Sequence, residues 1–384
     1  MHNDKNNNTN MNTDRVADAG DGGVTSTSAT SITSIASATS SALPTDSSPR
    51  GISRRTFIAG ASALPLFGIL TRKANAAEFT YKLATGQDPT HPVNVRAKEA
   101  IARILEATHG RLEIRLFPTN QLGSDTDLLA QVRNGGVEFF NLAASILSTL
   151  VPAAAIANTG FAFTNYDEVW KAMDGDLGKY IRAQIERVGI VTMSKAWDNG
   201  FRQITSSTHP IKTPEDLKGF KLRVPPSPML TSLFQSLGAG PTSINFNELY
   251  SALQTKLVEG QENPLPIIGT ARLNEVQKYC SMTGHVWDAY WILGNRAAVQ
   301  RLPEDIRQIV FAEFDRSGTD ERADIRKLND SLRGSLTAKG MQFFDVDHQA
   351  FRAALRKTDF YTTWHQKFGD QPWKLLQQTA GDLA

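Results

Sequence analysis

One arginine ends a short apolar segment immediately before two prolines, in GFKLRVPPSP (219–228). In a strand with a two-residue period, Leu222 and Val224 share one face, so Arg223 lies on the other face at the end of the strand. The guanidinium fork matches the two oxygens of a carboxylate, and its charge cannot be titrated away. We expect Arg223 to bind an anion, with an internal ion pair as the alternative.

Two further polar side chains are candidates for the same kind of chemistry. Arg202 lies in DNGFRQITS, where it binds either an anion or a carboxylate of the protein itself. Asn263 precedes Pro264, which favours an extended backbone and leaves the amide free to bond another group. A simple turn residue is the alternative for Asn263.

Motifs of enzyme active sites are missing from the sequence. It contains no G-x-S-x-G, no H-E-x-x-H and no glycine-rich phosphate loop, and Cys280 with His285 has no supporting motif. We therefore expect a protein that is not an enzyme and that uses neither a metal nor a cofactor. Aromatic side chains that could line a pocket or fill a core are Trp197, Trp287, Tyr290 and Trp291.

The elements that position these residues follow an alternating pattern. Residues 79–84 and 111–117 read as strands around a helix at 93–108, and Ser124-x-x-Asp127 is a helix cap before a buried strand at 137–142. Such β-α-β alternation predicts an α/β fold with a largely parallel sheet.

A second set of elements surrounds Arg223. Thr213-Pro214 starts a short helix, FKLRV (220–224) is a strand, and Asn245-x-x-Glu248 caps the helix that follows. Ligands of parallel sheets bind at the carboxyl ends of strands, which brings Arg223 and Phe246 close to a cleft. The segment from Pro303 to about Ala338 is helical for too many turns for one compact lobe, so we expect it to brace two.

The beginning of the chain differs in composition from the rest. An Asn run and a Ser/Thr/Ala tract make 1–52 a low-complexity segment that we interpret as disordered, with a start codon assigned too early as the alternative. Residues 53–76 have the layout of a cleavable export signal: Arg54-Arg55, a short apolar run and Ala74-Asn75-Ala76. The arginine pair resembles the twin-arginine signal, with a general secretory signal as the alternative. The mature chain then starts near Ala77, in the periplasm.

Charge and cysteine content limit the partners. Seven of the 41 basic and five of the 39 acidic residues precede residue 77, so the rest of the chain carries equal numbers of both. This balance argues against nucleic acid as a partner. The single cysteine, Cys280, excludes an internal disulfide.

Three ordered motifs resemble those of one family, and the likeness covers the chain from about Phe79 onward. They are FPTNQLGSDTDLLAQVRNGGVEF (117–139), NGFRQITSSTHPIKTPEDLKGFKLRVPPSP (199–228) and NELYSALQTKLVEGQENPL (247–265). They are similar to the motifs of the solute-binding proteins of tripartite ATP-independent periplasmic (TRAP) transporters, the DctP-like group.

The resemblance implies a two-lobed α/β periplasmic binding protein with a ligand cleft between the lobes and a long bracing helix. Lobe I would comprise 77–199 plus 289–328, and lobe II 200–288 plus 329–384. The protein would capture a small organic acid and deliver it to the membrane permease subunits of a TRAP transporter. The runner-up is a binding component of another transporter or a sensor, and a periplasmic hydrolase comes last.

The family's pattern also assigns roles to individual residues. Arg223 matches the arginine that clamps the substrate carboxylate, with Arg202 assisting it. The expected ligand contacts are Arg223, Arg202, Asn263, Phe246, Trp197, Gln121 and Asp125. The chain departs from sialic-acid binders at Ala143 and Ile146, where those have an acidic residue and an arginine. This apolar wall favours a small monocarboxylate, such as a branched 2-oxo or 2-hydroxy acid or an aromatic acid, over a sugar acid.

Overall fold

A computed structural model describes residues 76–383 of the 384-residue chain. The expected low-complexity segment 1–52 and, apart from Ala76, the expected signal segment 53–76 lie outside the described residues. Between residues 76 and 383, no helix combines the length and the apolar character needed to cross a membrane.

The strands form a continuous sheet with the order β2-β1-β3-β10-β5-β8-β6-β7; in addition β4 pairs with β10, β9 pairs with β5, and β11 pairs with β9. Their bounds are β1 (Phe79–Thr85), β2 (Leu112–Phe117), β3 (Phe139–Ala143), β4 (Ile190–Thr192), β5 (Trp197–Ser206), β6 (Lys221–Val224), β7 (Gly240–Ser243), β8 (Gly260–Pro264), β9 (Tyr279–Met282), β10 (Trp287–Asn295) and β11 (Gln342–Asp345).

The two flanks of the sheet are parallel, as the sequence predicts, but its middle is not. Strand β1 pairs in parallel with β2 and β3, and β6 pairs in parallel with β7 and β8. Strand β10 is antiparallel to both β3 and β5, and β5 is antiparallel to β8. The expectation of a largely parallel sheet is therefore wrong at the centre, where a strand from late in the chain is inserted between the two α/β halves.

The fold is the expected α/β architecture of two lobes, linked through β5 and β10. The predicted lobe boundaries at 199/200 and 288/289 fall inside these two strands. Helix α13, assigned by the sequence to the second lobe, contacts α4 and α5 of the first. The individual boundaries therefore stay a prediction.

Helices cover the sheet, and local signals in the sequence start several of them. Ser124 forms the predicted cap, a capping box with Asp127, and the predicted short helix begins after Thr213, whose backbone N–H donates to Asp216 Oδ2 (2.8 Å). The α-helices are α1 (Pro92–Ala107), α2 (Asp125–Asn134), α3 (Ala144–Leu147), α4 (Tyr166–Met173), α5 (Asp176–Arg187), α6 (Pro228–Ser236), α7 (Phe246–Gln254), α8 (Leu265–Thr270), α9 (Arg296–Arg301), α10 (Glu304–Ala338), α11 (His348–Arg356), α12 (Phe360–Phe368) and α13 (Asp370–Ala380). Short 3-10 helices are η1 (Pro152–Asn158), η2 (Pro214–Leu217) and η3 (Leu273–Glu275).

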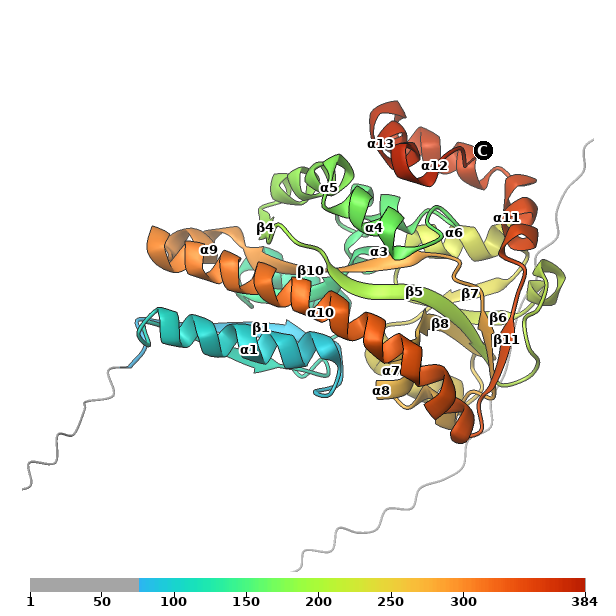
Figure 1. Ribbon diagram of the computed structural model, residues 1–384, viewed down its shortest axis with the longest axis horizontal. Coiled ribbons are helices and arrows are strands. Elements are labelled where there is room, and N and C mark those ends of the chain that lie inside the picture. Colours follow the sequence, from blue (N-terminus) through green and yellow to red (C-terminus); the bar gives the residue numbers. More distant parts are fainter. Residues whose placement is uncertain (1–75, 384) are drawn as a thin grey trace, which may run out of the picture. The chain divides into compact units, whose positions relative to one another are not determined.

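The 35-residue helix α10 braces both lobes, as expected (Figure 1). It packs along α1, where Arg96 Nε lies 2.6 Å from Asp324 Oδ2. It also crosses β5 and reaches α8, where a Cβ added to Gly269 would lie 2.8 Å from Leu332. One rigid element thus contacts the first lobe, the linking strand and the second lobe.

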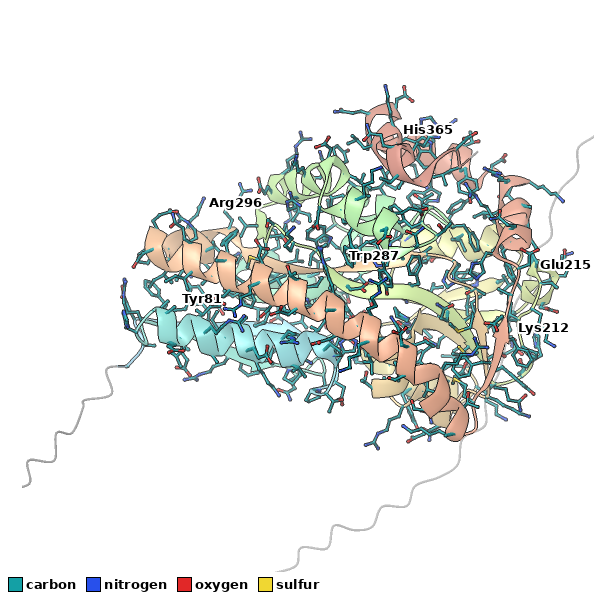
Figure 2. The ribbon with its side chains drawn as sticks, in the orientation of Figure 1. Tyr81, Lys212, Glu215, Trp287, Arg296 and His365 are labelled. Carbon is teal, nitrogen blue, oxygen red and sulfur yellow. The ribbon has the colours of Figure 1, made fainter. Side chains whose placement is uncertain are left out.

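Two carboxyl groups meet where α10 crosses β5. The backbone N–H of Asp198 donates to Glu321 Oε2 (2.8 Å), and the indole N–H of Trp287 donates to Asp198 Oδ1 (2.8 Å). Figure 2 shows Trp287 beside β5. Burial raises the pKa of Asp198 to about 7, and burial with the Asp198 charge raises the pKa of Glu321. Other ionisable groups that face the pair are Tyr166 on α4 and Arg322 and Asp324 on α10.

The pair of Asp198 and Glu321 should lower the free energy of unfolding as the pH rises. Both folded-state pKa values lie above the unfolded ones, so the stabilisation is complete below about pH 4; the part that comes from Asp198 is lost as the pH rises through about 7, and Glu321 acts in the same direction. Asp198 alone should give a slope near pH 6 of about 1 kcal/mol of unfolding free energy per pH unit, and Glu321 should make it steeper. In urea titrations from pH 5 to 8, Glu321→Gln should flatten this slope, and Asp320→Asn on the same helix should not. A parent protein whose stability rises over this range would contradict the assignment.

Candidate functional site

A small cavity of about 30 Å³ lies where the carboxyl ends of several strands meet. Gly86 follows β1, Ala143 ends β3, and Arg223 and Asn263 lie in the last two residues of β6 and β8. The first turns of α2, α3 and α7 begin beside these strand ends. The position agrees with the general preference of ligands for the carboxyl ends of strands. From the predicted set, the cavity is lined by Arg223, Arg202, Asn263, Phe246 and Asp125.

Arg223 is buried, with 1 % of its surface exposed, and has no ion pair among residues 76–383. Its Nε donates to the carbonyl of Ile244 (2.9 Å), and its Nη2 is buried without a hydrogen-bond partner. Burial lowers the pKa of Arg223 to about 10, although the nearby charges of Glu262 and Asp125 act in the opposite direction. The group stays cationic at neutral pH and lacks a counter-ion within contact distance.

Unlike Arg223, Arg202 has its charge neutralised by carboxylates of the protein. Its Nη2 lies 2.8 Å from Glu262 Oε1, and its Nη1 lies 3.3 Å from Asp288 Oδ2, with all three side chains buried. Burial alone would raise the pKa of Glu262, but the Arg202 charge and hydrogen bonds from His285 and Arg202 lower it to about 2. The alternative interpretation, an internal ion pair, describes what Arg202 does in the structure.

Asn263 is held in place by its neighbours. Its Oδ1 accepts from Arg202 Nη2 (3.1 Å), and its Nδ2 donates to Gln261 Oε1 (2.5 Å). Arg202 therefore positions Asn263, and both residues form one wall of the cavity.

Asp125 and Phe246 reach the cavity from the starts of α2 and α7. Asp125 Oδ1 accepts from Asn120 Nδ2 (2.8 Å), and burial raises the pKa of this carboxyl. Phe246 is half-buried and supplies an aromatic surface.

Gln121 and Trp197 are the two predicted contacts that do not line the cavity. Gln121 lies exposed in the turn after β2. Trp197 is fully buried against α10, where a Cβ added to Gly318 would lie 2.6 Å from its Nε1. Core packing, the alternative considered for the tryptophans, describes the position of Trp197.

Asn245 is the N-cap residue of α7, as predicted, but its side chain makes no hydrogen bond to the first turn of that helix. Instead its Nδ2 donates to Thr126 Oγ1 (3.2 Å), in the first turn of α2. The starts of α2 and α7 are thereby joined directly beside the cavity.

The cavity is also lined by two amides that were not predicted from the sequence, Asn141 on β3 and Asn199 on β5. Both side chains are almost completely buried and carry atoms without hydrogen-bond partners. A signal for Asn141 was available, because it is the only polar residue in the buried strand FFNLA. The apolar part of the wall includes Ala143 and Ile146, the positions that the sequence analysis singled out.

Comparison with known proteins matches residues 83–361 to the model of bacterial extracellular solute-binding protein, family 7. The chain is 33% identical over 306 residues to the protein y4mM of Sinorhizobium fredii, covering 79% of this chain and 56% of that longer protein. It also resembles the 2,3-diketo-L-gulonate-binding periplasmic protein YiaO of Escherichia coli, with 29% identity over 307 residues, 80% of this chain and 91% of YiaO.

Among solved structures, a TRAP periplasmic solute binding protein from Ralstonia eutropha H16 with bound (S)-2-hydroxy-2-methyl-3-oxobutanoate superimposes with a TM-score of 0.74. It is 28% identical, and the match covers 79% of this chain and 98% of that one.

Proposed function

Because the chain belongs to bacterial extracellular solute-binding protein family 7, the solute-binding proteins of TRAP transporters, we propose that it captures a small organic monocarboxylate and delivers it to a TRAP permease. The observation that carries this proposal is Arg223, a buried cation that lines the cavity and has no ion pair within the part of the chain that the structure describes. A buried charge is costly unless it is paired, so a ligand carboxylate is the natural partner.

The charges around the cavity support one carboxylate rather than two. Arg202 and Arg223 are the basic residues of the lining, and the charge of Arg202 is already balanced by Glu262 and Asp288. A dicarboxylate would place its second charge beside Asp125 or the apolar wall. Two like charges in contact repel, and an unpaired charge on an apolar surface loses its hydration.

The shape of the cavity supports a small ligand with an apolar part. Ala143, Ile146, Pro225 and Ile267 form the apolar part of its lining, which suits an alkyl group of the ligand, beside the amides of Asn141 and Asn199. The bound ligand of the Ralstonia relative is a branched monocarboxylate.

The lobes close around the ligand in this proposal. A cavity of about 30 Å³ has room for about one water molecule, so an acid enters only when the lobes separate or side chains move. Asp125 and Asn141 come from one lobe, Arg223 and Asn263 from the other, and the bond between Thr126 and Asn245 joins both sides. Contacts from both lobes exist together only in the closed state, which is the difference in affinity that drives closure.

The place of action in this proposal is the periplasm. The family and the relative YiaO support it, and the arginine pair Arg54-Arg55 supports export by the twin-arginine route.

A thermal-shift screen of the purified protein tests the proposed function. A ligand at about 100 times its Kd stabilises the folded state by about 2.7 kcal/mol. We expect small branched monocarboxylates to raise the Tm, and succinate and the neutral amides of the same acids to leave it unchanged. An amide that stabilises the protein as much as its acid would contradict recognition of a carboxylate.

A further inference from the structure

Four buried side-chain atoms without hydrogen-bond partners belong to three residues that line the cavity. They are Nη2 of Arg223, Oδ1 of Asn199 and both Oδ1 and Nδ2 of Asn141. Buried polar groups are normally paired, so their presence at one cavity points to the hydrogen-bonding groups of its ligand. Arg223 accounts for the carboxylate, which leaves the two amides to be explained.

The orientation of the Asn199 amide is fixed by Asp288. Asn199 Nδ2 lies 3.3 Å from Asp288 Oδ2, and this carboxylate also accepts from Ser145 and Asn158. A flipped amide would place its oxygen against a carboxylate oxygen, and two acceptors repel. The unpartnered atom of Asn199 is therefore an oxygen, which only a hydrogen-bond donor can satisfy.

Asn141 adds one donor and one acceptor. Its position on β3, two residues before Ala143, puts both side chains on the same face of the strand. A hydroxyl group both donates and accepts, so it can satisfy an amide oxygen and the Nδ2 of Asn141 together. One hydroxyl donates to one of the two amide oxygens of Asn141 and Asn199, whereas a carbonyl oxygen only accepts, so a ketone would leave both without a donor.

From these contacts we propose that the ligand is a 2-hydroxy acid with a short apolar side chain, and that Asn141 and Asn199 select it over the corresponding 2-oxo acid. The inference rests on the proposed carboxylate site at Arg223. In this proposal the hydroxyl lies on the carbon next to the carboxylate, and the side chain lies against Ala143 and Ile146. The ligand of the Ralstonia relative carries such a 2-hydroxyl.

Calorimetric titration with matched acids tests the proposal. The probes are 2-hydroxyisovalerate, 2-oxoisovalerate and isovalerate, which differ only at the second carbon. We expect the 2-hydroxy acid to bind roughly tenfold to a hundredfold more tightly than the other two, since each of them leaves buried amide oxygens unsatisfied. One enantiomer should also bind more tightly than the other, because the amides lie on fixed strands.

A variant at Asn141 tests whether this side-chain amide causes the preference for the 2-hydroxy acid. Asn141→Leu keeps the size of the side chain and removes both polar atoms, so it should reduce the preference for the 2-hydroxy acid to about threefold or less. Asn274→Leu, another asparagine with a buried unpartnered oxygen but outside the cavity, should retain the full preference.

The outcomes distinguish a failure of the proposed 2-hydroxy selectivity from a failure of the proposed function. If 2-oxoisovalerate binds to the parent as tightly as the 2-hydroxy acid, the present inference fails and the carboxylate site stands. If no monocarboxylate binds, in this set or in the wider screen, the proposed function fails. The comparison on the parent protein decides the matter even if Asn141→Leu does not fold.

Discussion

Replacing Arg223 by methionine is expected to weaken ligand binding by roughly 30-fold to several-thousand-fold. Removing one partner of a buried, hydrogen-bonded charge pair costs about 2 to 5 kcal/mol, because the ligand carboxylate is left buried without a counter-charge. At about 1.4 kcal/mol per tenfold, that cost gives the stated range. Lysine should restore part of the affinity, since it keeps the charge but lacks the planar fork. Calorimetry with the ligand identified by the screen measures the effect.

The same variant should fold at least as well as the parent. Arg223 has no ion pair, and its lowered pKa of about 10 shows that the fold disfavours the charged form. Because the folded-state pKa lies below the unfolded one, this destabilisation is complete at neutral pH and fades as the pH rises above about 10. Methionine keeps an unbranched stem and removes the charge, so urea denaturation without ligand should give an equal or higher unfolding free energy. Binding within about threefold of the parent would mean that Arg223 is a structural residue.

Replacing Arg202 by methionine should act mainly on folding, with a loss of about 3 to 5 kcal/mol of unfolding free energy at pH 7. The substitution leaves the buried carboxylates of Glu262 and Asp288 without their shared counter-ion. Urea denaturation of Arg202→Met beside Arg223→Met makes a matched comparison, because both arginines are almost completely buried in the same cavity wall.

Two controls test the cause of this loss. The lowered pKa of Glu262 stabilises the parent above about pH 4.5, and that contribution is lost as the pH falls toward 2. The difference between parent and Arg202→Met should therefore shrink in acid. The double variant Arg202→Met/Glu262→Gln should recover part of the lost stability, since it no longer buries the Glu262 charge. A single variant as stable as the parent at pH 7 would show that the ion pair contributes nothing.

The contrast between the two arginines shows what the sequence could reveal. Arg223 could be chosen because its signal is local: an alternating strand followed at once by Pro-Pro. The cap at Ser124 was found for the same reason, since its partner Asp127 lies three residues away. The partners of Arg202 are Glu262 and Asp288, which lie 60 and 86 residues further along the chain. No short sequence pattern predicts that ion pair.

Long-range contacts explain the other differences as well. Asn245 has the sequence of a helix cap, but its partner Thr126 lies 119 residues away and competes for the same amide. Trp197 was predicted to contact the ligand, but α10 buries it, and this helix begins about a hundred residues further along the chain. Resemblance to the family supplied the two-lobed fold. The selective amides could be recognised only once the structure showed which of their atoms have no partner.

The insertion of β10 between β3 and β5 has a consequence for how the chain folds. The first lobe includes residues 139–143, but the strand that pairs with them, 287–295, is synthesised only after most of the second lobe. The first lobe therefore cannot complete its sheet until residues 287–295 have been synthesised. A topology rich in such distant pairings has a high contact order and folds slowly. The unfinished edge of β3 is a place where partly folded chains can pair with one another, so high concentration during refolding favours aggregation.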